Sequence, residues 1–177
     1  EIEQAIVQGV KADSQAHPVT NIVLMGMGEP LDNLDNVVKA LEILYCDDGL
    51  GYGSRRITLS TSGLIPQMQE LAKRIRVGIA ISLNAPTDSV RDELMPINRR
   101  YPLKDLMQAC RELPLLPRER ITFEYILIRG VNDSLEDAKR LVRLLHGVKA
   151  KVNLIPYNEH EGSVLRSPLT KDIEAFQ

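Results

Sequence analysis

Residues 21–30 read Asn21-Ile22-Val23-Leu24-Met25-Gly26-Met27-Gly28-Glu29-Pro30, an apolar run followed by glycines, a carboxylate and a proline. The apolar run predicts a buried strand at 22–25, and Pro30 ends it because proline has no backbone N–H to donate. Gly28 lets a ligand approach the backbone closely. Glu29 then stands at the carboxyl end of the strand, where α/β folds bind ligands. We therefore expect a site here for a cation or for hydroxyl groups.

The same order of strand and helix repeats along the chain. Apolar runs predict further strands at 57–61, 77–83, 121–128 and 151–156. Amphipathic segments between them predict helices, and one more such segment precedes His17 and Pro18. Residues typical of helix starts are Asp32 and Asn33, Pro66, Asp88, Ser134 with Asp137, and Thr170.

Strict alternation of strands and helices favours an α/β fold with a parallel sheet and helices outside it. A complete (β/α) barrel usually takes about 250 residues, whereas this chain has 177. We therefore expect residues 1–177 to form a single domain, a parallel partial (β/α) barrel. Because the chain opens on a helical pattern, we also expect the first strand of the barrel to be missing.

The composition is that of an ordinary soluble globular protein, with 44% apolar and 26% charged residues. The 22 Lys and Arg nearly balance the 24 Asp and Glu, so the global charge neither favours nor excludes a nucleic-acid partner. There is no signal-peptide pattern and no apolar run near the roughly 20 residues that span a bilayer, so we expect no membrane association and a cytoplasmic protein. Cys46 and Cys110 are too few for a disulfide framework.

Small polar residues end four of the predicted strands: Gly28 and Glu29, Ser60 and Ser62, Ser82 and Asn84, Asn153 and Asn158. The carboxyl ends of barrel strands converge, so this set can bind a polar, zwitterionic ligand with adenosine-like hydroxyls. The set contains no His–Asp–Ser order, no metal-ligand cluster and no Gly-rich phosphate-binding loop. We therefore assign no catalytic and no metal-binding residue, and expect a cofactor to carry any chemistry.

These residues also have purely structural interpretations. Glu29 can cap the next helix, and Asn84 before Ala-Pro can form a turn. Asn153 differs because an amide buried inside an apolar strand needs partners, and a ligand is a natural one. The basic residues near loops are Arg55, Arg56, Arg91, Arg99 and Arg100. They suit a solvated surface, although Arg99-Arg100-Tyr101 can also bind a phosphate backbone and stack a base.

Five segments, taken in order, resemble one enzyme family. The segments are residues 25–30, 56–63, 81–86, 91–98 and 152–158. They resemble the RlmN family of radical S-adenosylmethionine (SAM) enzymes, which methylate carbon 2 of an adenine in 23S ribosomal RNA and in some transfer RNAs. The Cfr family, which methylates carbon 8 of the same adenine, shares much of the pattern.

The resemblance implies a SAM site in this chain. Its residues are Gly28 and Glu29 for the methionine amino group, then Ser60, the segment Ser82, Leu83 and Asn84, and Asn153. Relatives often carry His where this chain has Asn84. The implied RNA partners are 23S rRNA and tRNA, with a reductant such as flavodoxin.

The resemblance also implies parts that these 177 residues do not contain. The family's CxxxCxxC loop binds a 4Fe-4S cluster, and two further cysteines carry out methyl transfer; Cys46 and Cys110 match neither. We therefore expect this chain alone to be inactive. Two other classes of function stay open: a (β/α)-barrel isomerase or lyase without a cluster, and a non-catalytic binding domain.

Overall fold

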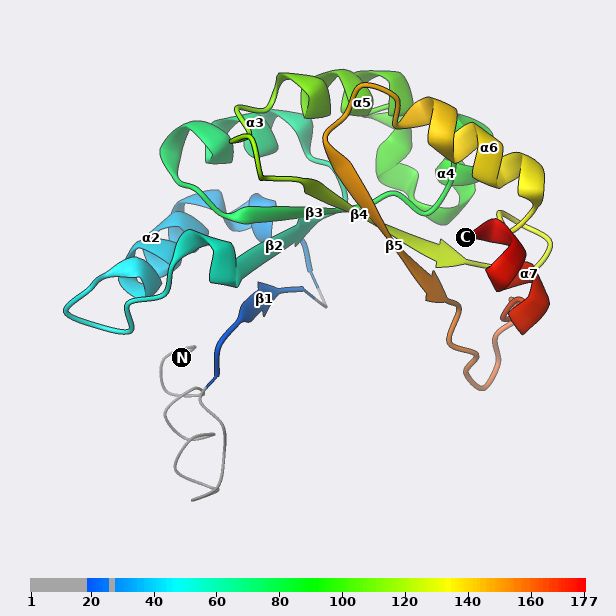
Figure 1. The fold of residues 1–177 in the computed structure, drawn as a ribbon, viewed down its shortest axis with the longest axis horizontal. Coiled ribbons are helices and arrows are strands. Elements are labelled where there is room, and N and C mark those ends of the chain that lie inside the picture. The colour runs from blue at the N-terminus through cyan, green and yellow to red at the C-terminus, as the bar shows by residue number, and fades with distance from the viewer. Residues whose placement is uncertain (1–18, 26–27) are drawn as a thin grey trace.

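A single parallel sheet organises the computed structural model, which describes residues 19–25 and 28–177. The strands lie in sequence order: β1 (Ile22–Leu24), β2 (Ile57–Thr61), β3 (Gly78–Ser82), β4 (Ile121–Leu127) and β5 (Ala150–Pro156). The sheet is open, with β1 and β5 at the edges of its described part (Figure 1). The predicted α/β class and parallel sheet are confirmed, and the predicted opening helix lies outside the described residues.

Six α-helices connect or follow these strands: α2 (Leu34–Tyr45), α3 (Ile65–Arg74), α4 (Asp88–Leu94), α5 (Leu103–Glu112), α6 (Leu135–Leu144) and α7 (Thr170–Phe176). Three short 3₁₀ turns are η1 (Pro30–Asn33), η2 (Ser54–Arg56) and η3 (Pro96–Arg99). Figure 1 shows α3, α5 and α6 lying over one face of the sheet. In the part of the chain that the structure describes, no helix has the length and apolarity needed to cross a membrane.

Most helix starts follow the predicted signals. Pro66 lies in the first turn of α3, Asp88 begins α4, and Ser134 with Asp137 forms a complete capping box on α6. The start of α2 is different: Asn33 precedes it without a side-chain capping bond. Instead the carboxylate of Glu29 caps the preceding turn η1 by accepting from the Leu31 N–H. The structural interpretation of Glu29 is therefore confirmed.

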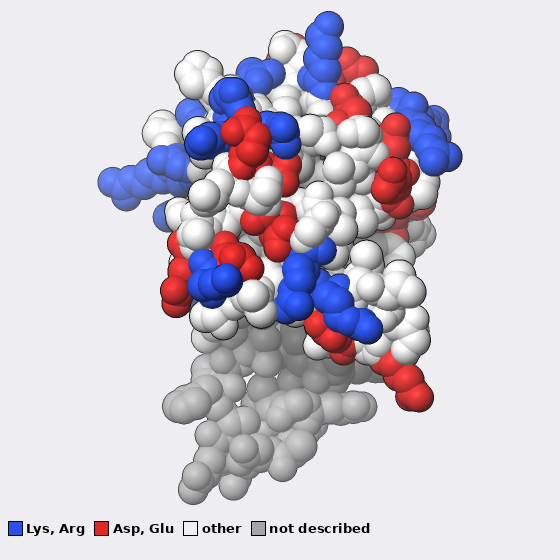
Figure 2. All heavy atoms as spheres, turned by 90° about the vertical axis from the view of Figure 1, so that its right-hand side faces the viewer, with Lys and Arg blue, Asp and Glu red and all other residues white. Residues whose placement is uncertain are grey.

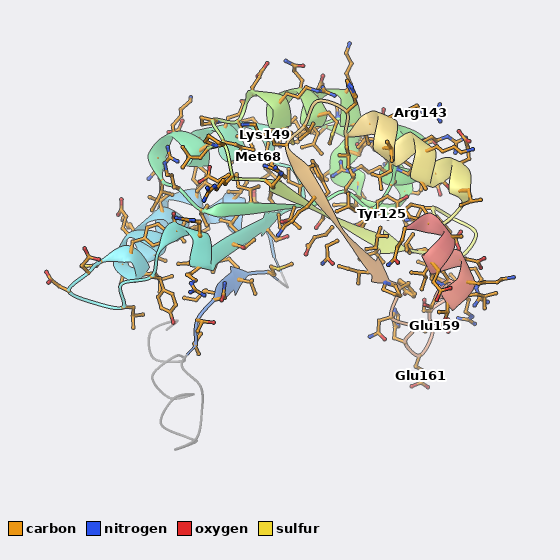
Figure 3. All side chains as sticks on the ribbon, viewed as in Figure 1. Met68, Tyr125, Arg143, Lys149, Glu159 and Glu161 are labelled. Atoms are coloured by element: carbon orange, nitrogen blue, oxygen red, sulfur yellow. The ribbon has the colours of Figure 1, made fainter. Side chains whose placement is uncertain are left out.

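Alternation along the strands gives the sheet two different faces. The face toward the helices is apolar; in β4 it presents Ile121, Phe123, Tyr125 and Leu127, all buried. Tyr125, labelled in Figure 3, packs its ring on Phe176 of α7 with 5.5 Å between ring centroids. The opposite face, which we call the inner face, carries the alternate residues, including Ser60, Ser82, Glu124 and Asn153. The core thus leaves a polar surface free on the inner face.

Candidate functional site

The loop after β1 and the carboxyl ends of β2 and β3 enclose a pocket of about 310 Å³. Its lining residues are Met25, Gly28, Glu29, Pro30, Ser60, Thr61, Ser62 and Ser82. Four of the predicted site residues, Gly28, Glu29, Ser60 and Ser82, therefore meet in one cavity. We call this cavity the strand-end pocket. Its volume lies at the lower end of the range of roughly 300–1,000 Å³ that is usual for ligand sites.

Glu29 joins the two sides of the strand-end pocket. Its Oε2 accepts hydrogen bonds from the N–H and the hydroxyl of Ser62, both at 2.7 Å, and its Oε1 accepts from Leu31 N at 3.1 Å. A carboxylate offers about four acceptor positions, so Oε1 keeps one for a ligand. The carboxylate is half-buried and held at both oxygens, which fixes its position before any ligand arrives.

The backbone before Glu29 requires glycine for conformation, not for space. Gly28 has φ of +102°, and no atom lies within 4 Å of where a Cβ would stand. A side chain there would be strained because L-residues rarely adopt this region. The conformation leaves the Gly28 backbone exposed at the mouth of the pocket.

Arg91 of α4 underlies the strand-end pocket and is only 1% exposed. Its Nη2 donates to the carbonyls of Ser62 and Ser82 at 2.8 and 3.0 Å. Its Nε donates to the Leu83 carbonyl at 3.0 Å, and its Nη1 to Asn98 Oδ1 at 3.0 Å. The prediction that Arg91 belongs to a solvated basic surface is therefore wrong, because its guanidinium ties the ends of β2 and β3 together.

Burial lowers the pKa of Arg91 to about 10, and the nearby carboxylates of Asp88 and Asp92 act in the opposite direction. The group stays charged at neutral pH. Asn98 connects it to both acids, since its amide donates to Asp88 Oδ1 at 2.9 Å and to Asp92 Oδ1 at 2.7 Å. Sequence reasoning gave neither Asn98 nor Arg91 a structural role, because the bond from Arg91 to Ser62 joins residues 29 positions apart and no local pattern indicates it.

Leu83 and Asn84 lie beside the strand-end pocket but do not line it. Leu83 is fully buried. Asn84 has φ of +58°, a left-handed conformation that does not continue the strand, and β3 ends at Ser82. The amide of Asn84 is already bonded within the chain. Its Oδ1 accepts from Ile126 N at 3.0 Å and its Nδ2 contacts Met95 Sδ at 3.3 Å. In this conformation Asn84 joins β3 to β4, so its predicted contact with SAM stays a prediction.

A second amide, Asn132, holds the same junction from the other side. It is fully buried, and its Nδ2 donates to the carbonyls of Asn84 and Ile126, both at 2.7 Å. Sequence reasoning missed Asn132 because an Asn followed by Asp after a strand is typical of a simple turn. The two amides together define where β3 and β4 end.

Asn153 lies on the edge strand β5 in register with Glu124. The prediction that it is a buried amide is wrong: it is exposed, because no further strand among the described residues covers β5. Alternation places its side chain on the inner face with Glu124. Asn153 also borders a larger cavity of about 1,020 Å³ between β5, α6 and α7. That cavity is lined mainly by apolar residues such as Leu135, Val142 and Phe176, and it does not suit a zwitterion.

Glu124 is a second carboxylate near the site that sequence reasoning missed. Its Oε2 accepts from Ser60 Oγ at 3.4 Å, and its neighbours in register are Ser82 on β3 and Asn153 on β5. It is half-buried, and within residues 19–25 and 28–177 no cation forms an ion pair with it. The sequence did contain an indication of this carboxylate. Glu124 stands between Phe123 and Tyr125, so the alternation of a strand turns its side chain away from the apolar face.

The two cysteines do not form a metal site. Cys46 is exposed at the end of α2, whereas Cys110 is buried in α5. Burial raises the pKa of the Cys110 thiol to about 12, so it stays protonated and unreactive at neutral pH. Among the described residues, no group of three His, Cys, Asp or Glu side chains is placed to bind a metal ion.

Comparison with known proteins places these features in a family. The family model described as the Radical SAM superfamily matches residues 2–145. The chain is 65% identical over 172 residues to "Dual-specificity RNA methyltransferase RlmN" from Syntrophotalea carbinolica, covering 97% of this chain and 46% of that protein. It is 57% identical over 171 residues to the protein of the same name from Geobacter sulfurreducens, covering 97% and 48%. The chain thus spans about half the length of the curated relatives it matches.

Solved structures agree on the fold. A radical SAM methyltransferase from Sphaerobacter thermophilus superimposes with a TM-score of 0.90 at 43% identity, over 98% of this chain and 50% of that chain. A domain of pyruvate-formate lyase-activating enzyme from Bacteroides vulgatus superimposes with a TM-score of 0.64 at 17% identity, over 88% and 89% of the two chains. At 17% identity, the similarity to the activating-enzyme domain shows a shared fold and nothing more.

Proposed function

This chain belongs to the radical SAM superfamily, and we propose that it is the SAM-binding core of an RNA methyltransferase whose strand-end pocket holds the methionine part of the cofactor. The observation that carries the proposal is the meeting of Gly28, Glu29, Ser60 and Ser82 in one cavity. Membership in the superfamily disfavours the alternatives of a cluster-free barrel enzyme and of a non-catalytic domain.

The finer proposal is methylation of carbon 2 of an adenine in 23S rRNA, with tRNA as a second substrate. Its support is the name shared by two relatives that are 65% and 57% identical to this chain, "Dual-specificity RNA methyltransferase RlmN". Methylation of carbon 8, as in the Cfr family, is the alternative. The target adenine has to leave its stack to reach a pocket at the strand ends.

The residues present fit the methionine end of SAM. Its ammonium is a cation with three donors, and Glu29 offers a fixed anionic acceptor with one free position on Oε1. The hydroxyl of Ser62 donates its hydrogen bond to Oε2 of Glu29. It therefore orients the carboxylate and leaves the free position on Oε1 to the ligand. Gly28 lets the ligand lie against bare backbone.

The inner face fits the ribose of the same cofactor. A carboxylate can accept from both hydroxyls of a ribose, as acidic residues do in dinucleotide-binding folds. Glu124 occupies such a position, beside Ser60 and in register with Ser82 and Asn153. These residues would bind and orient SAM; when bound to an iron–sulfur cluster, SAM supplies a radical that activates unreactive C–H bonds.

The residues present do not fit the cluster itself. A 4Fe-4S cluster needs closely spaced thiolates, and the chain has only Cys46, which is exposed, and Cys110, which is buried and protonated. On this proposal the cysteine ligands come from sequence outside these 177 residues, as does the docking site for a reductant such as flavodoxin. A CxxxCxxC motif encoded upstream in the gene is the simplest check.

Methyl transfer to RNA tests the proposed function directly. The complete gene product, with its cluster reconstituted and a reductant supplied, is incubated with methyl-labelled SAM and either an unmodified 23S rRNA fragment or unmodified tRNA. We expect 2-methyladenosine in the digested RNA by mass spectrometry. Finding 8-methyladenosine would replace the finer proposal with the Cfr-type reaction. Absence of any label in rRNA and tRNA would refute RNA methylation.

Glu124→Gln tests the ribose contact. Replacing a charged acceptor by a neutral one costs about 1.5 kcal/mol, so we expect SAM to bind roughly tenfold more weakly while the melting temperature is unchanged. Equilibrium dialysis of the complete gene product against SAM measures the effect. Glu93→Gln is the matched control, because Glu93 is exposed on α4. Equal affinity of the Glu124 and Glu93 variants for SAM would remove Glu124 from the site.

A further inference from the structure

Basic side chains gather at the end of the sheet opposite the strand-end pocket. All strands run in one direction, so their amino ends lie together (Figure 1). Two cavities, of about 270 and 410 Å³, lie at these amino ends and share Ser54, Arg55, Arg118 and Glu119. We call the two cavities together the amino-end groove. Its cations are Arg55, Arg76, Arg118, Arg120 and Lys151.

The positive charge of the amino-end groove is poorly neutralised. Its only lining acid is Glu119, whose Oε2 accepts from Leu116 N at 2.8 Å and whose Oε1 lies 3.7 Å from Arg76 Nη1. Arg55, Arg118 and Lys151 are exposed and form no ion pair within the described part of the chain. Five cations against one carboxylate is a local excess in a chain whose net charge is −2.

The charges around α6 are neutralised. On α6, Arg143 pairs with Glu136 at 2.7 Å and Arg140 with Asp137 at 2.9 Å. Figure 2, which views the side that carries α6 and α7, shows Lys and Arg interspersed with Asp and Glu. The excess of cations at the amino-end groove is therefore not shared by the surface around α6 and α7.

Hydroxyl groups accompany the cations. Ser54, Thr58 and Thr122 line the smaller cavity, and Lys149, labelled in Figure 3, stands one residue before β5 at the same end of the sheet. Arginine, lysine and hydroxyl side chains are the groups that proteins use to contact nucleic-acid phosphates. The groove also lacks an aromatic lining residue that would stack a base.

From these observations we propose that the amino-end groove binds the phosphate backbone of the RNA substrate. This inference rests on the proposed function. At roughly 3.3 Å per residue, a strand of five to seven residues places the groove about 20 Å from the strand-end pocket. The groove therefore contacts the RNA at a distance from the target adenine. Contacts to phosphates position the substrate but do not read its base sequence.

The test compares RNA binding by the complete gene product and by the double variant R55A/R118A. Each lost phosphate contact lowers the slope of log K against log salt by about 1, so we expect the slope to fall by roughly 2. We also expect at least about tenfold weaker binding of an unmodified 23S rRNA fragment at low salt. SAM affinity should stay the same, because neither residue lies near the strand-end pocket.

The matched control is K139A/R143A, which also removes two exposed cations, from α6 (Arg143 in Figure 3). An unchanged salt slope in R55A/R118A, an equal loss in the control, or a parallel loss of SAM affinity would each overturn the proposal. Methylation of RNA by the wild-type protein is measured in a separate assay from RNA binding. If wild type methylates RNA and the groove variant binds RNA normally, only the groove proposal fails.

Discussion

Replacing Glu29 with alanine in the complete gene product is expected to weaken SAM binding by at least about thirtyfold and to abolish reductive cleavage of SAM, while the absorbance of the cluster survives. When a hydrogen-bonded charge pair is shielded from bulk water, removing one partner by mutation costs about 2–5 kcal/mol of binding free energy. Glu29 is also the acceptor for Ser62 N, Ser62 Oγ and Leu31 N. The alanine variant therefore loses both the anion and the link between the β1 loop and β2.

Glu29→Gln separates these two losses. An amide keeps one oxygen acceptor for Ser62, so the pocket should stay folded while the negative charge is gone. Equilibrium dialysis with SAM and the melting temperature are measured on both variants, with Asp32→Ala as control because Asp32 is an exposed acid in the same turn. Normal SAM cleavage by Glu29→Ala would refute the role of Glu29 as the anchor of the amino group.

Local sequence patterns predicted the fold well because they act over a few residues. The strand at 57–61 and the start of α4 at Asp88 agree with the structure to the residue, and the other strands differ by at most one residue at either end. The differences have identifiable causes. β3 ends at Ser82 and not at Leu83 because Asn84 takes a left-handed conformation and bonds to the next strand through Ile126 N.

The site was predicted only in part, because several of its contacts join residues far apart in the sequence. The residues after β1 and β2 carry visible signals, and Glu29 does meet Ser62, 33 residues away, at 2.7 Å. The bonds from Asn132 to Asn84 and from Arg91 to Ser62 have no local signature. Asn153 shows the opposite error: its apolar neighbours indicate burial, but β5 lies at the sheet edge.

Arg91→Ala is expected to destabilise the protein by about 3–5 kcal/mol, the usual cost of breaking a buried charged network. The substitution leaves the carbonyls of Ser62, Ser82 and Leu83 without their donor, and a cavity where the guanidinium lay. Asp88 and Asp92 also lose their nearby cation. For a domain of this size the melting temperature should fall by roughly 10 °C.

Arg91→Lys distinguishes loss of charge from loss of geometry. An ammonium keeps the charge but cannot reach acceptors on both strand ends and on Asn98 as the planar guanidinium does. We therefore expect a folded protein that binds SAM more weakly. Arg91 does not line the pocket, but its loss frees the backbone of Ser62 and Ser82, which do line it. Arg99→Ala, at an exposed neighbouring position, should change stability by less than about 0.5 kcal/mol. If Arg91→Lys bound SAM like wild type, the strand ends would be held by the rest of the core, and Arg91 would contribute to folding alone.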